Sequence, residues 1–201
     1  MSDKKEPSQI LRHVPEEIVG ERVCLRPLRD EDAPAIYEAI EESRAQLIPW
    51  LPFVTPEYDL REAETFVRRS RANWILRKDL GLAIWRREDG RYLGGTGLHR
   101  IDWEIPHFEI GYWLRTSEEG KGYMIETVKL LARTCFETLG ANRLEIRCDS
   151  LNFRSAAVPR RLGFIHEATL RNQSRTATGE LRDTFIFALT PEDYARVSLD
   201  F

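Results

Sequence analysis

Two kinds of hydrophobic spacing divide the chain. Over 31–43, and again from Thr55 or Asp59 to about Arg77, apolar residues recur at the three- and four-residue intervals of an amphipathic helix. Farther along, apolar and polar residues alternate, as they do in strands that bury one face. The pattern predicts strands over 21–28, 81–87, 91–101, 107–114, 142–148, 164–170 and 181–189, and helices over 31–43, 59–77, 124–139 and 152–161.

Residues at the ends of these segments support the predicted boundaries. Asp30 stands at the N-cap position of the first helix, and Asp89-Gly90 supplies turn residues that tolerate positive φ between two strands. The helix over 124–139 carries one continuous apolar stripe and ends at Gly140, which suits a C-terminal cap.

The order of the elements predicts one α+β domain over residues 18–201. Residues 1–17 are polar and contain prolines, so they predict a flexible lead-in. No internal repeat, low-complexity tract or linker follows residue 18. The segment 46–56 contains several prolines among large apolar residues, and it cannot be a regular helix throughout.

Composition and charge narrow the class of protein. Among 201 residues, 42% are apolar and 31% are charged, and 30 basic against 33 acidic side chains give a formal net charge of −3. Because nucleic-acid-binding proteins usually carry a basic excess, no nucleic-acid partner is predicted. No apolar run approaches the ~18 residues of a membrane-spanning helix, and the N-terminal residues lack a signal-peptide pattern. We therefore expect a soluble, cytoplasmic protein with no membrane partner.

The cysteines fit a reducing compartment. Cys24, Cys135 and Cys148 form an odd, widely spaced set without a CxxC pair, which argues against a disulfide framework and a metal site. Cys135 lies on the apolar stripe of a predicted helix, and Cys148 shares a strand face with Leu144 and Ile146. Both are predicted to be structural, since buried cysteine acts as a small hydrophobic residue.

The segment 114–126 lies between the most regular strand and the strongest helix, and it contains the candidate chemistry. Gly120 and Gly122 occupy the point where the chain turns from strand into helix. Glycines there let main-chain N–H groups approach a ligand closely, and a helix N-terminus favours an anion such as a pyrophosphate. Taken alone, these residues are more often an ordinary turn with a cap, here a capping box of Thr116 and Glu119.

Two better-known phosphate-binding motifs do not explain this segment. The sequence contains no GxxxxGK[ST], so it is not a P-loop protein. Gly94, Gly95 and Gly97 lie inside a strand pattern rather than between a strand and a helix, so they are not a dinucleotide-binding motif.

Four longer stretches occur in a recognisable order. They are FEIGYWL (108–114), EGKGYMIET (119–127), NFRSAAVPRRLGFIHEA (152–168) and LRDTFIFAL (181–189). Together they resemble the GNAT acyltransferase superfamily, in particular its RimJ/RimL-like branch of protein N-terminal acetyltransferases, over roughly residues 18–195. The resemblance implies a three-layer α/β fold with a twisted, mixed, mostly antiparallel sheet of about seven strands. It also implies acetyl-CoA as a co-substrate and no metal.

The resemblance further implies which residues bind the cofactor. The segment 119–124 matches a pyrophosphate-binding loop of the pattern Gln/Arg-x-x-Gly-x-Gly/Ala. Glu119 and Met124 depart from this pattern, and an acid beside a pyrophosphate is unfavourable unless Lys121 offsets it. The implied cofactor-binding residues are Glu119, Gly120, Lys121, Gly122, Tyr123 and Met124 in the loop, the main chain of Trp113, Leu114 and Arg115, and Asn152.

Amide formation sets the requirements for the catalytic residues. A primary amine must be neutral to attack a thioester, so a base or a water relay is needed. Glu109, which projects from the strand beside the expected cofactor, is the predicted base. Ser155 matches the hydroxyl that protonates the leaving thiolate in the family. Trp50, in the apolar segment after the first helix, and His107 are the predicted acceptor-binding residues.

Other polar residues receive weaker assignments. Arg154, Arg160 and Arg161 are candidates for contact with the adenosine phosphate of coenzyme A. His99 and His166 are predicted to be ordinary strand or loop histidines, and His13 lies in the lead-in and is assigned no role.

The leading prediction is an acetyl-CoA-dependent N-acetyltransferase that acts on a primary amine, most plausibly the α-amine of a protein or peptide. A small amine, such as a polyamine, an aminoglycoside or an amino acid, is the alternative acceptor. A non-catalytic acyl-CoA-binding module and a purely structural role are further alternatives. Because relatives are often dimers, the resemblance also implies a homodimer.

Overall fold

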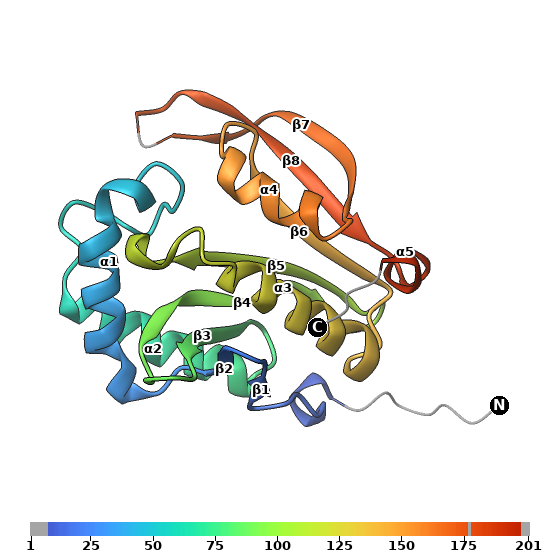
Figure 1. The fold of residues 1–201 in the computed structure, drawn as a ribbon, viewed down its shortest axis with the longest axis horizontal. Helices are drawn as coiled ribbons and strands as arrows, with labels where there is room; N and C mark the ends of the chain where they lie inside the picture. The colour runs from blue at the N-terminus through green and yellow to red at the C-terminus, as the bar shows by residue number, and fades with distance from the viewer. Residues whose placement is uncertain (1–7, 177, 198–201) are drawn as a thin grey trace.

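Eight strands form one sheet at the centre of the computed structural model, which describes residues 8–176 and 178–197. Their order across the sheet is β1-β2-β3-β4-β5-β6-β8-β7 (Figure 1). The strands are β1 (Ile18–Val19), β2 (Val23–Pro27), β3 (Leu80–Arg86), β4 (Tyr92–Asp102), β5 (His107–Leu114), β6 (Arg143–Asp149), β7 (Ile165–Arg175) and β8 (Leu181–Leu189). The α-helices are α1 (Ala33–Leu47), α2 (Leu60–Ile75), α3 (Tyr123–Arg133), α4 (Phe153–Arg161) and α5 (Pro191–Arg196).

Each pair of neighbouring strands is antiparallel except β5 and β6. These two run parallel, and they pair only from His107 opposite Arg143 to Ile110 opposite Ile146. Beyond Ile110, β5 stays with β4 while β6 stays with β8, so a wedge opens between β5 and β6 (Figure 1). The predicted α+β fold with a mixed, mostly antiparallel sheet is confirmed.

Helices cover both faces of the sheet, which gives three layers. On one face, α3 buries Val128 and Leu131 with Phe108 and Ile110 of β5. On the other face, α1 and α2 form a second apolar core, made by Ile36, Ile40, Ala63 and Val67 together with Ala83 and Tyr92 of the sheet. Because side chains alternate along a strand, even-numbered residues of β5 face α3 and odd-numbered residues face the α1–α2 layer.

Of the N-cap residues predicted for α1 and α2, only the one for α2 is confirmed. Asp59 is the N-cap of α2, and its carboxylate accepts a hydrogen bond from the N–H of Glu62 at 2.9 Å. Asp30, in contrast, does not cap α1, because a 3-10 turn over Asp30–Asp32 precedes that helix. Within this turn the Asp32 carboxylate accepts from the main-chain N–H of Arg29 at 2.7 Å.

Contacts with the domain begin inside the predicted lead-in. Residues 1–7, like 198–201 at the other end, lie outside the described part of the chain. Val14 is buried, and the Arg12 guanidinium lies over the Trp103 ring and donates to the carbonyl of Trp103 at 3.0 Å. The additional strand β1 is only two residues long, too short for an alternating pattern to reveal it.

Candidate active site

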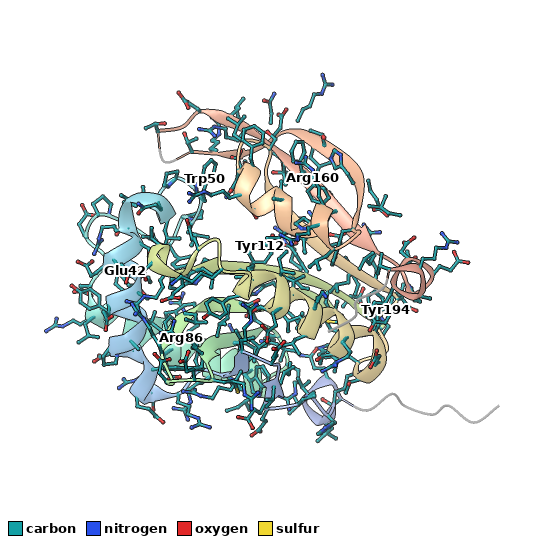
Figure 2. The ribbon with its side chains drawn as sticks, in the orientation of Figure 1. Glu42, Trp50, Arg86, Tyr112, Arg160 and Tyr194 are labelled. Carbon is teal, nitrogen blue, oxygen red and sulfur yellow. The ribbon has the colours of Figure 1, made fainter. Side chains whose placement is uncertain are left out.

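A cavity of about 730 Å³ lies at the wedge, between the C-terminal half of β5 and α4. Figure 2 shows Trp50 and Tyr112 on two sides of it. The C-terminal half of β5, the turn before α3, and α4 form its walls together with the segment that follows α1. The cavity-lining residues that the sequence analysis had selected are Trp50, Trp113, Leu114, Glu119, Gly120, Met124, Asn152 and Ser155.

The turn before α3 is left-handed at two glycines. Gly120 has φ of +74° and Gly122 of +85°, conformations that residues with a Cβ atom rarely adopt. Gly122 immediately precedes α3, and the N–H of Glu126 donates back to its carbonyl at 3.2 Å. The N–H groups between these two residues belong to the first turn, where a helix offers no acceptor. The turn therefore presents main-chain donors and the positive end of the α3 dipole to one end of the cavity.

An ion pair that the sequence analysis did not single out fixes this turn to the sheet. The buried Glu126 carboxylate accepts from the main-chain N–H groups of Arg22 at 2.7 Å and Val23 at 3.2 Å, and from Nε of Arg22 at 2.9 Å. Nη1 of Arg22 also donates to the carbonyl of Lys121 at 2.9 Å. Arg22 and Glu126 lie 104 positions apart, so no local sequence signal could have paired them.

The acid at the start of the turn is neutralised, but not by Lys121. The Nζ atom of Lys121 donates to the buried carboxylate of Glu118 at 3.0 Å. Glu119 instead forms an ion pair with Arg154 of α4, and both residues line the cavity. The expected compensation by Lys121 is thus corrected: Arg154 supplies the positive charge, because α4 lies across the wedge from the turn.

Only alternate main-chain groups of β5 face the cavity. The N–H of Arg115 donates to the carbonyl of Leu93 on β4 at 2.8 Å. Because N–H groups alternate in direction along an antiparallel strand, those of Tyr112 and Leu114 point to the opposite edge, where β6 has diverged. The N–H groups of Trp113 and Arg115 point to β4, so the predicted main-chain contacts narrow to Leu114 and gain Tyr112.

Arg115 joins α1 to the turn instead of lining the cavity. Its side chain is buried and donates to Glu42 at 2.9 Å and to Glu38 at 2.7 Å. Burial alone would raise the pKa of Glu42, but hydrogen bonds from Arg115 and Ser117 lower it to about 2. This role belongs to the side chain, whereas the cofactor contact predicted for Arg115 involves its main chain, whose N–H donates to Leu93.

Two hydroxyl groups meet inside the cavity. Oγ of Ser155 donates to the Tyr112 hydroxyl at 3.3 Å, and that hydroxyl donates to the carbonyl of Ser155 at 2.9 Å. Asn152 caps α4, because its Oδ1 accepts from the N–H of Ser155 at 3.0 Å. Burial raises the pKa of Tyr112, although its hydrogen bond with Ser155 acts in the opposite direction. The sequence analysis missed Tyr112, since the alternation identifies it only as a residue of one strand face.

The two cysteines nearest the core show no sign of reactivity. Burial raises the pKa of the Cys148 thiol to about 11, and Cys135 is fully enclosed in the apolar core. A thiol that stays protonated at neutral pH is a poor nucleophile. These surroundings agree with the structural roles predicted for both.

Two predicted side chains lie toward the paired end of β5. Glu109 contacts Arg100 at 3.0 Å and Arg147 at 3.2 Å. Burial raises the pKa of Glu109, while these arginines act in the opposite direction. His107 is the first residue of β5, with its Nε2 3.7 Å from Oε2 of Glu145. His107 does not line either cavity, and the wedge opens at the other end of the strand.

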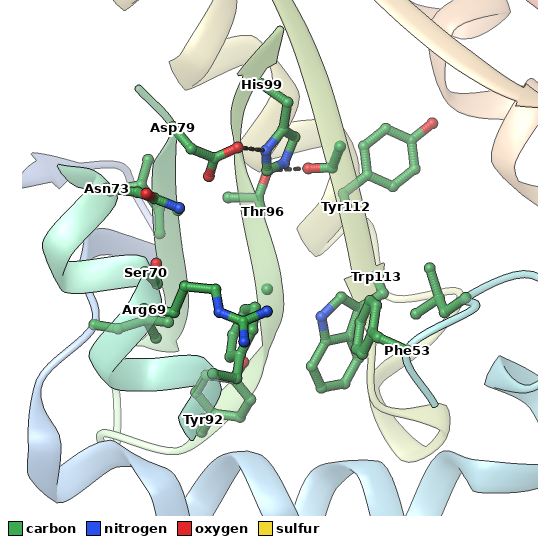
Figure 3. Close-up of a pocket in the computed structure, with 17 residues that line it drawn as sticks. Phe53, Arg69, Ser70, Asn73, Asp79, Tyr92, Thr96, His99, Tyr112 and Trp113 are labelled. Carbon is green, nitrogen blue, oxygen red and sulfur yellow. Dashed lines mark hydrogen bonds and ion pairs between the residues drawn. The ribbon is translucent and has the colours of Figure 1, made fainter. Parts of the chain in front are cut away.

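A second cavity, of about 400 Å³, lies on the α2 side of β5 (Figure 3). It shares Leu51, Tyr112 and Trp113 with the first cavity, so the two lie on either side of the C-terminal half of β5. Gly81, Gly97 and Gly111 stand opposite one another on β3, β4 and β5, and a Cβ added at Gly81 would lie 2.5 Å from Oγ of Ser70 and one added at Gly111 2.8 Å from Cδ2 of His99. The apolar walls are formed by Leu28, Leu51, Phe53, Phe66, Leu82, Tyr92 and Trp113.

One polar pair projects into this second cavity. Nδ1 of His99 on β4 lies 2.6 Å from Oδ2 of Asp79, which precedes β3 (Figure 3). Arg69 and Asn73 of α2 contribute the other long polar side chains. The sequence analysis treated His99 as an ordinary strand histidine, since Asp79 is twenty positions away and forms no motif with it.

Residues 8–176 and 178–197 contain neither a metal-binding cluster nor a membrane-spanning helix. That part of the chain has no group of three or more His, Cys, Asp or Glu side chains able to hold a metal ion. None of its helices is both long enough and apolar enough to cross a membrane.

Comparison with known proteins shows the family. Residues 22–165 match the model of the acetyltransferase (GNAT) domain. The putative ribosomal N-acetyltransferase YdaF of Bacillus subtilis is 33% identical over 156 residues, which cover 77% of this chain and 84% of YdaF. The uncharacterized N-acetyltransferase p20 of Bacillus licheniformis is 28% identical over 180 residues, 90% of this chain and 99% of p20.

The fold is shared with solved structures. A putative ribosomal-protein-serine acetyltransferase from Vibrio cholerae superposes with a TM-score of 0.74 at 28% identity, covering 87% of this chain and 97% of that one. RimL, a ribosomal L7/L12 alpha-N-protein acetyltransferase, gives a TM-score of 0.80 at 23% identity, covering 89% and 96%. Together with the family match, these similarities establish that the chain belongs to the GNAT family of acetyltransferases.

Proposed function

We propose that this chain transfers the acetyl group of acetyl-CoA to the N-terminal α-amine of a protein or peptide. The observation that carries the proposal is the pair of cavities on either side of β5, which allows two substrates to be held on one strand at the same time. Holding both in place removes much of the entropic barrier to their reaction. We also expect the chain to act in the cytoplasm as a homodimer, as the sequence analysis predicts.

The first cavity fits coenzyme A. The turn at Gly120 and Gly122 offers main-chain donors and a helix N-terminus for the diphosphate. The N–H of Leu114 and the amide of Asn152 border the cavity where the pantetheine arm would run toward β5. Bound there, acetyl-CoA supplies an activated acetyl thioester.

Residues of β5 and α4 can assist both halves of the transfer. The N–H of Tyr112, which points into the wedge, can donate to the carbonyl oxygen as that oxygen gains negative charge. The Ser155 hydroxyl, held beside Tyr112, can give its proton to the departing thiolate. Glu109, the base that the sequence predicts, forms ion pairs with Arg100 and Arg147.

The second cavity favours a peptide over a polyamine. Its walls are mainly apolar, and Asp79 is the only acidic residue among those that line it within the described chain. That carboxylate is already bonded to His99, whereas a polyamine requires several free carboxylates. The names given to YdaF, a putative ribosomal N-acetyltransferase, and to the Vibrio cholerae structure, a putative ribosomal-protein-serine acetyltransferase, support a protein acceptor.

The acceptor class can be tested with matched peptides. We expect acetyl transfer from acetyl-CoA to peptides that have a free N-terminus. Mass spectrometry should detect each added acetyl group as an increase of about 42 Da. The same peptides blocked by formylation at the N-terminus, with lysine side chains left free, should not react. Equal reaction of blocked and free peptides, or reaction of small amines alone, would contradict the proposed acceptor.

Replacing Glu119 with glutamine should tighten coenzyme A binding by about 2- to 5-fold, which corresponds to about 0.5–1 kcal/mol. The substitution removes a negative charge from the turn and releases Arg154 for a phosphate contact. Isothermal titration of coenzyme A into both proteins measures the effect. Glu64→Gln on the exposed face of α2 is the matched control, and a weaker affinity of Glu119→Gln would show that the carboxylate helps binding.

Replacing Gly122 with alanine should weaken coenzyme A binding by about 10-fold, since a left-handed conformation costs a residue with a Cβ about 1–2 kcal/mol. The added Cβ would also lie 3.3 Å from Nη2 of Arg22, which holds the turn. Gly140→Ala is the control, because Gly140 also has positive φ, +67°, but lies after α3 with nothing near its Cβ position. Titration should find unchanged affinity for Gly140→Ala, and equal affinity for both variants would refute the role of the turn.

A further inference from the structure

We propose that Nε2 of His99 is the base that takes the proton from the acceptor amine, and that Asp79 positions its imidazole. The inference rests on the proposed function, because it assigns a residue to the second cavity of the same enzyme. It replaces Glu109 in this role.

The Asp79–His99 contact fixes which nitrogen can accept a proton. Nδ1 of His99 lies 2.6 Å from Oδ2 of Asp79, and an ionised carboxylate can only accept a hydrogen bond. Nδ1 therefore carries the proton, and Nε2 of the neutral ring keeps its lone pair. Nε2 accepts no hydrogen bond from the described residues, and 36% of the His99 side chain is exposed. The lone pair is thus free to bind an amine that enters the cavity.

The glycine row brings this nitrogen against β5. A Cβ added at Gly111 would lie 2.8 Å from Cδ2 and 2.9 Å from Nε2 of His99, and one added at Gly97 would lie 3.1 Å from Cε1. The imidazole therefore lies flat over positions that only glycine can occupy. Gly111 directly precedes Tyr112, whose N–H points to the thioester side of the strand, so the ring packs on β5 one residue from the group proposed to bind the thioester carbonyl.

Glu109 is less suited to the same task. It stands opposite His99 across the β4–β5 pair, but its carboxylate contacts both Arg100 and Arg147. It does not line either cavity. His99, in contrast, lines the second cavity together with the apolar walls that would hold the acceptor.

The proton balance of the transfer closes with this assignment. As the nitrogen of the neutral amine forms its bond to the acetyl carbon, Nε2 of His99 takes one N–H proton. The carbon–sulfur bond breaks, and the thiolate takes one proton from Ser155, which solvent restores through the Tyr112 hydroxyl. His99 then releases its proton to solvent, so the products are an amide and a thiol with no net change in protons.

His99→Ala, with His99→Gln as a second variant of the same site, tests the assignment. We expect kcat/KM to fall about 100-fold, the typical worth of a general base, while the Kd of coenzyme A stays within 2-fold. Added imidazole should restore a large part of the activity of His99→Ala, because it can occupy the vacated space. Asp79→Asn should lower kcat about 10-fold without rescue by imidazole, since His99 still fills its place. His166→Ala, on an exposed part of β7, is the matched control and should behave as wild type.

The pH dependence gives an independent measurement. The kcat/KM of the wild type should show a rising limb as a base loses its proton, and that of His99→Gln should not. The ionisable groups around the ring are Asp79, Arg69 from α2, Glu109 from β5, and Arg100 on the same strand as His99. Glu109→Gln should therefore keep the rising limb.

Three outcomes would overturn the assignment. The first is that both His99 variants keep a kcat/KM within 3-fold of wild type. The second is that imidazole does not restore the lost activity of His99→Ala. The third is that the rising limb of the pH profile disappears only in Glu109→Gln. A wild-type chain that binds coenzyme A but acetylates no amine would instead overturn the proposed function, and this inference with it.

Discussion

Ser155→Ala is expected to lower kcat by about 10²–10³-fold, the range that a well-placed proton donor contributes. The Kd of acetyl-CoA should change by less than about 3-fold, because Ser155 contributes one hydroxyl among many groups that line the first cavity. The Ser155 hydroxyl is already aligned by the Tyr112 hydroxyl at 3.3 Å. Without it, the thiolate must leave unprotonated or wait for water. Steady-state release of thiol and titration of the cofactor measure the two quantities separately.

Two further variants make this prediction specific. Tyr112→Phe keeps the ring in place but removes the hydroxyl that orients Ser155, so a smaller loss of about 10-fold in kcat is expected. Ser174→Ala removes an exposed hydroxyl on β7 and should leave kcat unchanged. Turnover of Ser155→Ala equal to that of wild type would remove Ser155 from the mechanism.

Local patterns predicted most of the elements because they depend on neighbouring residues. The alternation over 107–114 and 181–189 gives β5 and β8 with the bounds that the structure has. The helix predicted over 124–139 extends to Thr138, but its last segment, Thr134–Thr138, is π-helical instead of α-helical. A π turn changes the helical period by less than the spacing of apolar residues can resolve.

The wedge could not be predicted, because it depends on where two strands stop pairing. β5 and β6 separate after Ile110, and nothing in either strand's own sequence marks that point. The same limit applies to His107. Alternation places His107 on one face with Glu109 and Trp113, but it does not say how far along the strand a site lies. An eight-residue strand spans about 25 Å, enough to remove His107 from the cavities.

The candidate site was predictable where it is a continuous segment and unpredictable where it is assembled. The turn at Gly120 and Gly122 has a sequence signature, because positive φ demands glycine at those positions. The groups that support it come from elsewhere: Arg154 from α4, and Arg22 from the residue before β2. Such partners become visible only when the fold brings distant segments together.

Glu126→Ala is expected to lower the free energy of unfolding by about 3 kcal/mol, the largest stability effect among these variants. The Glu126 carboxylate is buried and accepts from the main-chain N–H groups of Arg22 and Val23 as well as from the Arg22 guanidinium. Removing it leaves these donors without an acceptor, at a cost of about 1–3 kcal/mol for each buried group. Urea unfolding of the variant and wild type measures the difference.

A graded series connects this loss to function. Glu126→Gln keeps one acceptor oxygen, so its loss of stability should be about half as large. The control, Glu64→Ala on the exposed face of α2, should have a free energy of unfolding within about 0.5 kcal/mol of wild type. Because Arg22 also holds the carbonyl of Lys121, freeing its guanidinium in Glu126→Ala should loosen the turn and weaken coenzyme A binding in the same order as stability falls. Full stability of Glu126→Ala would show that water reaches these donors. Full stability loss with unchanged affinity would show that the turn keeps its shape without the anchor on β2.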